Sequence, residues 1–99
     1  MKAHFLEIRE EAQQELQDGF DWYEIQQIDL GRRFILKVRE YINTLKLFPE
    51  QYQMIYKKKR AVFIKEFPFQ IIYSIIGNTV VVFSVFHTKR NPKIWKKRK

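Results

Sequence analysis

The feature that most constrains the fold is a pair of apolar segments joined by Gly77-Asn78. The segment IIYSII ends just before this dipeptide, and VVVFSVF follows it. Gly-Asn between two runs of β-branched and aromatic residues predicts a tight β-hairpin, with strands over Phe69–Ile76 and Thr79–His87. Because both faces of these strands are apolar, we expect them in the middle of a sheet that is covered on both sides. Helices would cover one face, and a partner's helix or strand could cover part of the other.

The first half of the chain follows a helical pattern instead, with apolar residues every three or four positions. One helix is predicted from about Arg9, and its apolar stripe is Ile8, Ala12, Leu16, Phe20 and Tyr23. A second is predicted from about Gly31 to Leu47, with the stripe Phe34, Ile35, Val38, Tyr41, Ile42 and Leu45, and Pro49 ends it. Gly19 inside the first stripe indicates a close approach between the two helices.

Shorter segments complete the predicted fold. AHFLEI at 3–8 predicts a short opening strand, and Gln51–Tyr56 and Ala61–Phe67 predict two more strands. The predicted order is β-α-α-β-β-β-β, an α+β fold in which a twisted antiparallel sheet carries a helical hairpin on one face. The chain has 99 residues, so we expect one domain over 1–95 and a mobile basic tail over 96–99.

Charge is divided unevenly along the chain. Residues 1–50 hold seven Lys and Arg against ten Asp and Glu, a net charge of −3, and most of these acids are expected on solvated helix faces. Residues 51–99 hold twelve Lys and Arg against the single acid Glu66, a net charge of +11. A domain this small with such a division has a bipolar surface, and its basic part should attract a polyanion or an acidic protein segment.

Several classes of function are excluded or disfavoured by composition. The chain has no cysteine, which excludes disulfides and thiolate chemistry, and His4 and His87 lack carboxylates at metal-ligand spacing. Glycine-rich nucleotide-binding loops are absent, so we expect neither a metal nor a cofactor. The longest apolar stretch, Val80 to Phe86, is far shorter than the roughly 20 residues that span a bilayer. We expect no membrane contact and a cytoplasmic location.

The basic run Lys57, Lys58, Lys59 and Arg60 is the first candidate binding segment. Four cations between two strands can grip phosphates by charge, or they can form a solvated loop. Arg60 differs from the lysines because it opens an apolar strand, so its guanidinium should have a defined partner. An arginine can hold a phosphate or a carboxylate through two hydrogen bonds, where a lysine acts as a point charge.

The segment HTKRNPKIWKKRK at the end of the chain is the second candidate. His87 closes the last strand, where it is either a general acid or base near neutral pH or a structural histidine bonded to backbone. Pro92 turns the chain and holds Arg90 near the sheet edge, and Lys89 beside it is a further candidate for binding nucleic acid or the target. Trp95 either packs on the body of the domain or stacks on a base or a partner, with Arg98 beside it.

These residues together resemble the RelE/ParE toxin superfamily, and more narrowly its ParE-like plasmid stabilization branch. The similarity covers nearly the whole chain and rests on Ala12-x-x-x-Leu16, Trp22-Tyr23-Glu24, Leu30-Gly31-x-x-Phe34, Pro49, Arg60, Phe67-Pro68-x-x-Ile71-x-Tyr73 and His87-x-x-Arg90-x-Pro92-x-x-Trp95-x-x-Arg98. The most specific piece is FPFQIIY followed by HTKRNPKIW at this distance. The resemblance implies a small antiparallel sheet with a helical hairpin, which agrees with the fold predicted from periodicity.

The resemblance also implies a function. Members of the superfamily are growth-inhibiting toxins of type II toxin–antitoxin modules, and a small acidic antitoxin folds on its toxin and neutralises it, in a complex that we expect to be a heterotetramer. ParE-like members poison DNA gyrase and have no known catalytic residues. RelE-like members cleave mRNA on the ribosome, a role that would make His87 and Arg60 catalytic here. Ribonuclease members usually carry an arginine where this chain has Gln70, so the sequence favours gyrase and leaves the ribonuclease as the alternative.

Overall fold

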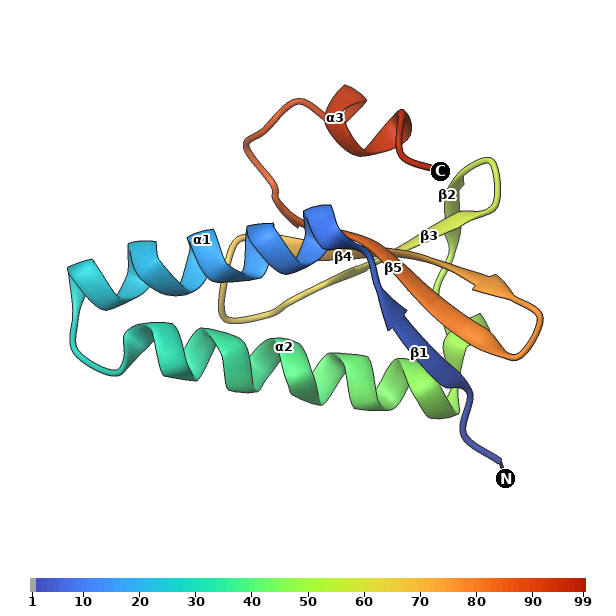
Figure 1. Cartoon of the computed structure of the whole chain (residues 1–99), viewed down its shortest axis with the longest axis horizontal. Helices are drawn as coiled ribbons and strands as arrows, with labels where there is room; N and C mark the ends of the chain where they lie inside the picture. The colour runs from blue at the N-terminus through green and yellow to red at the C-terminus, as the bar shows by residue number, and fades with distance from the viewer. Residues whose placement is uncertain (1) are drawn as a thin grey trace.

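The computed structural model describes residues 2–99 and has the predicted order of long elements (Figure 1). The elements are β1 (Phe5–Ile8), α1 (Glu10–Gln26), α2 (Leu30–Leu47), the 3-10 turn η1 (Pro49–Gln51), β2 (Met54–Tyr56), β3 (Lys59–Phe63), β4 (Phe69–Ile76), β5 (Thr79–His87) and α3 (Lys93–Lys96). The α+β class, the opening strand, the helical hairpin and both strands of the central β-hairpin are therefore confirmed. The short helix α3 was not expected from the sequence.

The five strands form one sheet in the order β1-β5-β4-β3-β2. The β4–β5 hairpin has other strands on both sides, as its two apolar faces predict. The sheet is mixed, and not antiparallel throughout, because β1 pairs in parallel with β5 from Phe5 beside Thr79 to Ile8 beside Val82. No tight turn joins β1 to β5, since the rest of the fold separates them, so nothing forces an antiparallel pairing at this edge.

Two short strands differ from the predicted boundaries. β2 begins only at Met54, because η1 takes up the residues after Pro49. β3 begins at Lys59, earlier than predicted, because Lys57 and Lys58 alone form the turn between Tyr56 and Lys59. Lys57 takes the left-handed φ of 51° that such a tight turn requires.

The two long helices pack closely because glycine allows it. A Cβ added to Gly19 would lie 2.6 Å from the Phe34 ring of α2, and a Cβ on Gly31 would lie 2.5 Å from the carbonyl oxygen of Phe20. The predicted close approach at Gly19 is thus confirmed. The Glu24 carboxylate accepts a hydrogen bond from the backbone N–H of Gly31 at 3.0 Å, where an acid is favoured at the start of α2.

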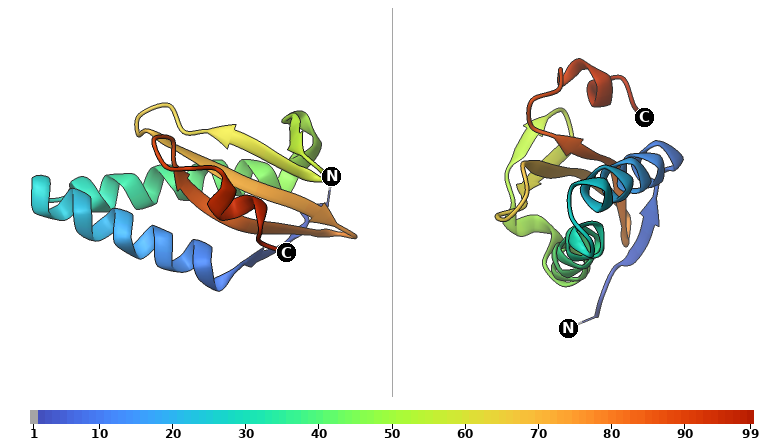
Figure 2. Two further views of the ribbon diagram at one scale, coloured as in Figure 1. Left: turned by 90° about the horizontal axis from the view of Figure 1, so that it is seen from above. Right: turned by 90° about the vertical axis from the view of Figure 1, so that its left-hand side faces the viewer.

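The main core lies between the helical hairpin and one face of the sheet (Figure 2). Its centre is aromatic: the Phe34 ring lies 4.8 Å from Phe69 and 5.3 Å from both Tyr23 and Phe67, measured between ring centroids. Phe34 is fully buried. Burial of such rings and their edge-to-face contacts fix α2 on the sheet.

The second face of the sheet is partly covered by the end of the same chain. Trp95 of α3 packs on Ile72 of β4 and Phe86 of β5, and only 2% of its surface is exposed. Its ring also lies against Tyr56, 6.1 Å away. The C-terminal segment thus covers part of this face, on the side of the sheet away from the long helices (Figure 2).

Tyr73 should make stability fall between pH 10 and pH 12. Its ring is fully buried, its hydroxyl donates to the Pro49 carbonyl, and burial raises the pKa of Tyr73 from 10.0 to about 12. Because the unfolded chain releases this proton first, the contribution is complete below pH 10 and is lost as the pH rises to 12, by roughly 2–3 kcal/mol in all. Urea unfolding measured at several pH values checks this.

The matched control is Tyr73→Phe, which keeps the ring and removes the titrating hydroxyl. Its unfolding free energy should fall less steeply over the same pH interval, with Tyr23, whose pKa is also raised by burial, still contributing. Equal pH dependence in the two proteins would contradict the assignment to Tyr73.

Candidate functional site

A buried carboxylate on α1 organises the end of the chain. Glu15 is 9% exposed, and its Oε1 accepts hydrogen bonds from the Ser84 hydroxyl at 2.9 Å and the Val85 backbone N–H at 3.2 Å. The Arg98 guanidinium donates to the same oxygen at 2.8 Å. Glu15 therefore joins the first helix, the last strand and the C-terminal segment through one side chain.

The edge of β5 explains why a carboxylate is needed here. β1 pairs with β5 only as far as Val82, so the backbone of β5 beyond it has no neighbouring strand on this side. A buried N–H without a partner is costly, and Glu15 supplies the acceptor that a longer β1 would have supplied to Val85. Arg98 then balances the charge of the carboxylate.

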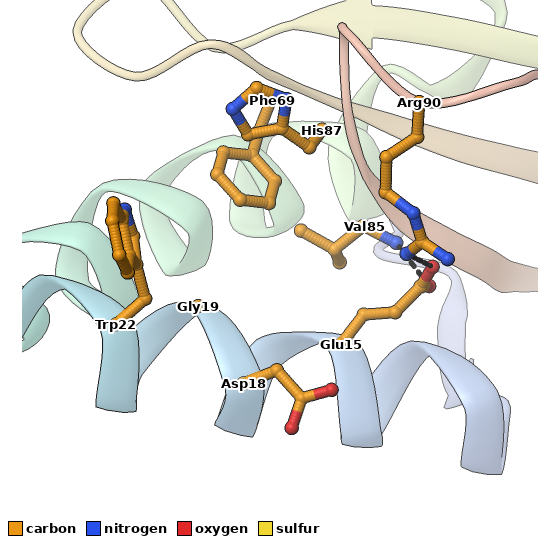
Figure 3. Close-up of a pocket in the computed structure, with 8 residues that line it drawn as sticks. All are labelled: Glu15, Asp18, Gly19, Trp22, Phe69, Val85, His87 and Arg90. Carbon is orange, nitrogen blue, oxygen red and sulfur yellow. Dashed lines mark hydrogen bonds and ion pairs between the residues drawn. The ribbon is translucent and has the colours of Figure 1, made fainter.

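A hollow of about 310 Å³ opens beside this carboxylate, between α1 and the end of β5 (Figure 3). It is lined by Glu15, Asp18, Gly19, Trp22, Phe69, Val85, His87 and Arg90. Four of these side chains can carry charge, two acidic and two basic. Trp22 stands at the end of the hollow away from Glu15, with 58% of its surface exposed.

His87 and Arg90, both predicted site residues, meet in this hollow. His87 Nδ1 accepts a hydrogen bond from the Lys89 backbone N–H at 3.1 Å, which places the ring proton on Nε2, and the ring lies edge-on to Phe69 at 5.1 Å. Arg90 Nη1 lies 3.6 Å from Glu15 Oε2. The Arg90 guanidinium also stands over the Phe86 ring. His87 thus makes the backbone contact of a structural histidine, and its side chain also lines the hollow.

Arg60 lies far from His87. Arg60 pairs with Tyr73 across β3 and β4, whereas His87 pairs with Phe69 across β5 and β4. Tyr73 and Phe69 are four residues apart on β4, roughly 13 Å at the usual rise of a strand. The two residues proposed as a catalytic set are therefore not brought together.

Arg60 does have the defined partner that the sequence predicts, although this partner is backbone. Its Nη1 donates to the carbonyl oxygens of Tyr52 at 2.7 Å and Glu50 at 3.2 Å. These bonds hold the segment after η1 against β3. The guanidinium is thus already engaged by the fold.

The remaining predicted site residues separate into two groups. Trp95 packs in the second core, so the expectation of packing is met and stacking on a free base is not available to it. Arg98 donates hydrogen bonds to Glu15 and to the Phe83 carbonyl oxygen at 3.1 Å. The prediction of a mobile tail over 96–99 is therefore wrong for Arg98. Lys57, Lys58 and Lys89 are exposed, and Lys59 is half-buried.

Sequence reasoning missed Glu15, Asp18 and Trp22. For Glu15 the expectation of a solvated helix face is wrong, because the residue lies three positions after buried Ala12 and four before buried Gly19. That spacing puts Glu15 on the apolar stripe of α1, so the sequence alone could have predicted that this side chain is buried. Asp18 and Trp22 line the hollow only because the chain end folds back beside α1, which no local pattern specifies.

Within residues 2–99, no three His, Cys, Asp or Glu side chains are grouped so that they could hold a metal ion. No helix in the same part of the chain has the length and apolarity needed to cross a membrane.

Comparison with known proteins identifies the family. The sequence matches, over residues 6–92, the family described as ParE toxin of type II toxin-antitoxin system, parDE. The chain belongs to this toxin family. A solved structure titled "Chromosomal ParDE TA system from P. aeruginosa" has the same fold, with a TM-score of 0.79 at 13% sequence identity over 88% of this chain and 98% of the other. No match is found among curated proteins.

The match supports the ParE side of the resemblance drawn from the sequence, and with it a type II toxin. It ends at Pro92, so Trp95 and Arg98, the residues that fasten the C-terminal segment, lie beyond the matched region.

Removing the Glu15 carboxylate should destabilise the fold strongly. Glu15→Ala leaves Arg98 without its acid and the Val85 N–H without an acceptor, and breaking a buried pair in this way costs about 3–5 kcal/mol. Glu11→Ala is the matched control, since Glu11 is exposed one turn earlier on α1 and should change stability by no more than about 0.5 kcal/mol. Urea denaturation measures both. A loss below about 1 kcal/mol for Glu15→Ala would contradict the role given to it.

Proposed function

We propose that this chain is a ParE-like toxin that inhibits growth through DNA gyrase, a protein target, and that a cognate antitoxin neutralises it. The family match over residues 6–92 carries the proposal. The solved relative with the same fold is titled a ParDE TA system, which supports an antitoxin as the partner of this chain.

The arrangement of the basic residues favours a protein target over mRNA cleavage. Cleavage of RNA needs an acid–base group beside a cation that stabilises the phosphorane. Arg60 stands too far along the sheet to serve His87, and its guanidinium is engaged by backbone carbonyls. Arg90 does stand beside His87, but the carboxylates of Glu15 and Asp18 line the same hollow and disfavour a phosphodiester there.

Pulse labelling after induction in a bacterial host tests the target. If gyrase is poisoned, incorporation of labelled thymidine should fall within the first minutes while incorporation of labelled methionine persists. An earlier fall in methionine incorporation would contradict the proposal and favour a ribosome-dependent ribonuclease.

Substitution of His87 separates the two mechanisms further. For a gyrase poison, His87→Ala should leave growth inhibition within a few-fold of the parent, because no proton transfer depends on the ring. For a ribonuclease, loss of a general acid or base should reduce activity by about 10²-fold or more. Colony counts after graded induction measure this, with expression levels matched by immunoblot.

We propose further that the antitoxin occupies an apolar groove on the helical side. A hollow of about 320 Å³ is lined there by Leu6 and Ile8 of β1, Leu16 of α1, and Ile35, Val38, Arg39, Ile42 and Asn43 of α2. β1 is an edge strand, and its exposed Phe5 and Leu6 extend the apolar surface. An antitoxin segment that folds on binding can lay apolar side chains in this groove and place a carboxylate on Arg39.

A charge in the groove should weaken neutralisation without abolishing toxicity. Leu6→Glu puts a carboxylate where the antitoxin would bury apolar side chains. The Kd of this variant for the antitoxin, taken as the protein encoded by the neighbouring gene, should therefore be at least tenfold higher than that of the parent chain. The matched control is Ile76→Glu, an exposed apolar position at the β4–β5 turn. Calorimetric titration gives both constants; an equal effect of the two variants would place the antitoxin elsewhere.

A further inference from the structure

Two aromatic rings on the second face of the sheet gather cations from distant parts of the chain. Lys57 of the β2–β3 turn and Lys96 of α3 both lie over the Tyr56 ring, with Nζ 5.4 Å and 5.1 Å from its centroid. Lys59 Nζ lies 4.7 Å from the centroid of Phe83, which the Arg9 guanidinium also approaches. The ring faces attract these cations and hold them near one another against their repulsion.

Lys58, Lys93 and Lys97 extend this cluster. Lys58 completes the β2–β3 turn, Lys93 opens α3 in the same short helix as Lys96, and Lys97 follows directly after this helix. We define the lysine face as Lys57, Lys58, Lys59, Lys93, Lys96 and Lys97. Within the part of the chain that the structure describes, none of the six forms an ion pair, whereas Arg9, Arg90 and Arg98 each have a carboxylate partner.

Unpaired like charges held together are a cost to the folded domain that a polyanion would remove. Lys57 and Lys96 sit on one ring and are thus at most about 10.5 Å apart, close to the Debye length at physiological salt, so the surrounding solution screens their repulsion only in part. A surface of this kind suits a partner with regularly spaced negative charge.

We propose that the lysine face binds the phosphate backbone of double-stranded DNA. The aromatic rings beneath the cations favour a duplex over a single strand. Phe83 is 4% exposed, and Tyr56 is half-buried against Trp95 with Lys57 and Lys96 over its ring, so little aromatic surface is left to stack on an unpaired base. Single strands are held largely by such stacking, whereas a duplex can be held by phosphate contacts alone. This contact is independent of the gyrase target and requires only the isolated chain.

Fluorescence anisotropy with a labelled 20-base-pair duplex tests the proposal on the full chain, made by cell-free translation. If the six lysines meet phosphates, the slope of log K against log salt should be about −5. The variant Lys57→Gln/Lys59→Gln/Lys96→Gln should reduce this slope to about −3 and lower affinity at least tenfold at 0.1 M salt. Arginine at the same three positions should restore affinity, because the proposed contact depends on positive charge beside the phosphates.

The matched control removes three charges from the opposite side of the domain, with Arg32→Gln/Arg33→Gln/Lys46→Gln on α2. It should keep the slope near its original value. Equal losses from the two triple variants would show that net charge alone matters and would overturn the assignment to the lysine face. Equal or tighter binding of single-stranded DNA or duplex RNA would overturn the choice of duplex DNA, and so would binding of a polyglutamate peptide with no binding of DNA.

Discussion

The fold depends on one buried acid. Glu15 accepts from the open edge of β5 and from Arg98 near the end of the chain, so it both completes the sheet and fastens the C-terminal segment. With Arg98 held there, Trp95 covers Ile72 and Phe86, which would otherwise be exposed on the second face of the sheet. One ion pair thus allows a sheet only five strands wide to bury its two most apolar strands on both sides.

The surfaces proposed for binding lie on different sides of this buried ion pair. The helical side carries the apolar groove beside β1, the hollow at Glu15 holds His87 and Arg90, and the lysine face lies over the sheet's other surface. The uneven charge along the sequence becomes an uneven charge on the surface, because β2, β3 and α3, which carry the lysine face, all come from the basic half of the chain. The groove proposed for the antitoxin and the lysine face proposed for DNA therefore lie on different sides of the molecule.

Local patterns predicted the parts of the fold that depend on local physics. The Gly77-Asn78 turn, the two apolar strands and both long helices follow from periodicity and turn chemistry, and they lie close to where the sequence places them. The parallel pairing of β1 and the docking of Arg98 were not predictable in this way, since each joins residues far apart in the chain. Arg60 shows the same limit. The sequence predicted that its guanidinium has a defined partner, but that this partner is a backbone carbonyl and not a phosphate depends on where η1 lies.

A double-mutant cycle between Glu15 and Arg98 tests the central claim most directly. Unfolding free energies would be measured for the parent chain, Glu15→Ala, Arg98→Ala and the double variant. If the pair fastens the C-terminal segment to the core, the double variant should lose less than the sum of the single losses, with a coupling of about 1–3 kcal/mol. Losses that add to within about 0.5 kcal/mol would show that the two residues act independently and would contradict the account.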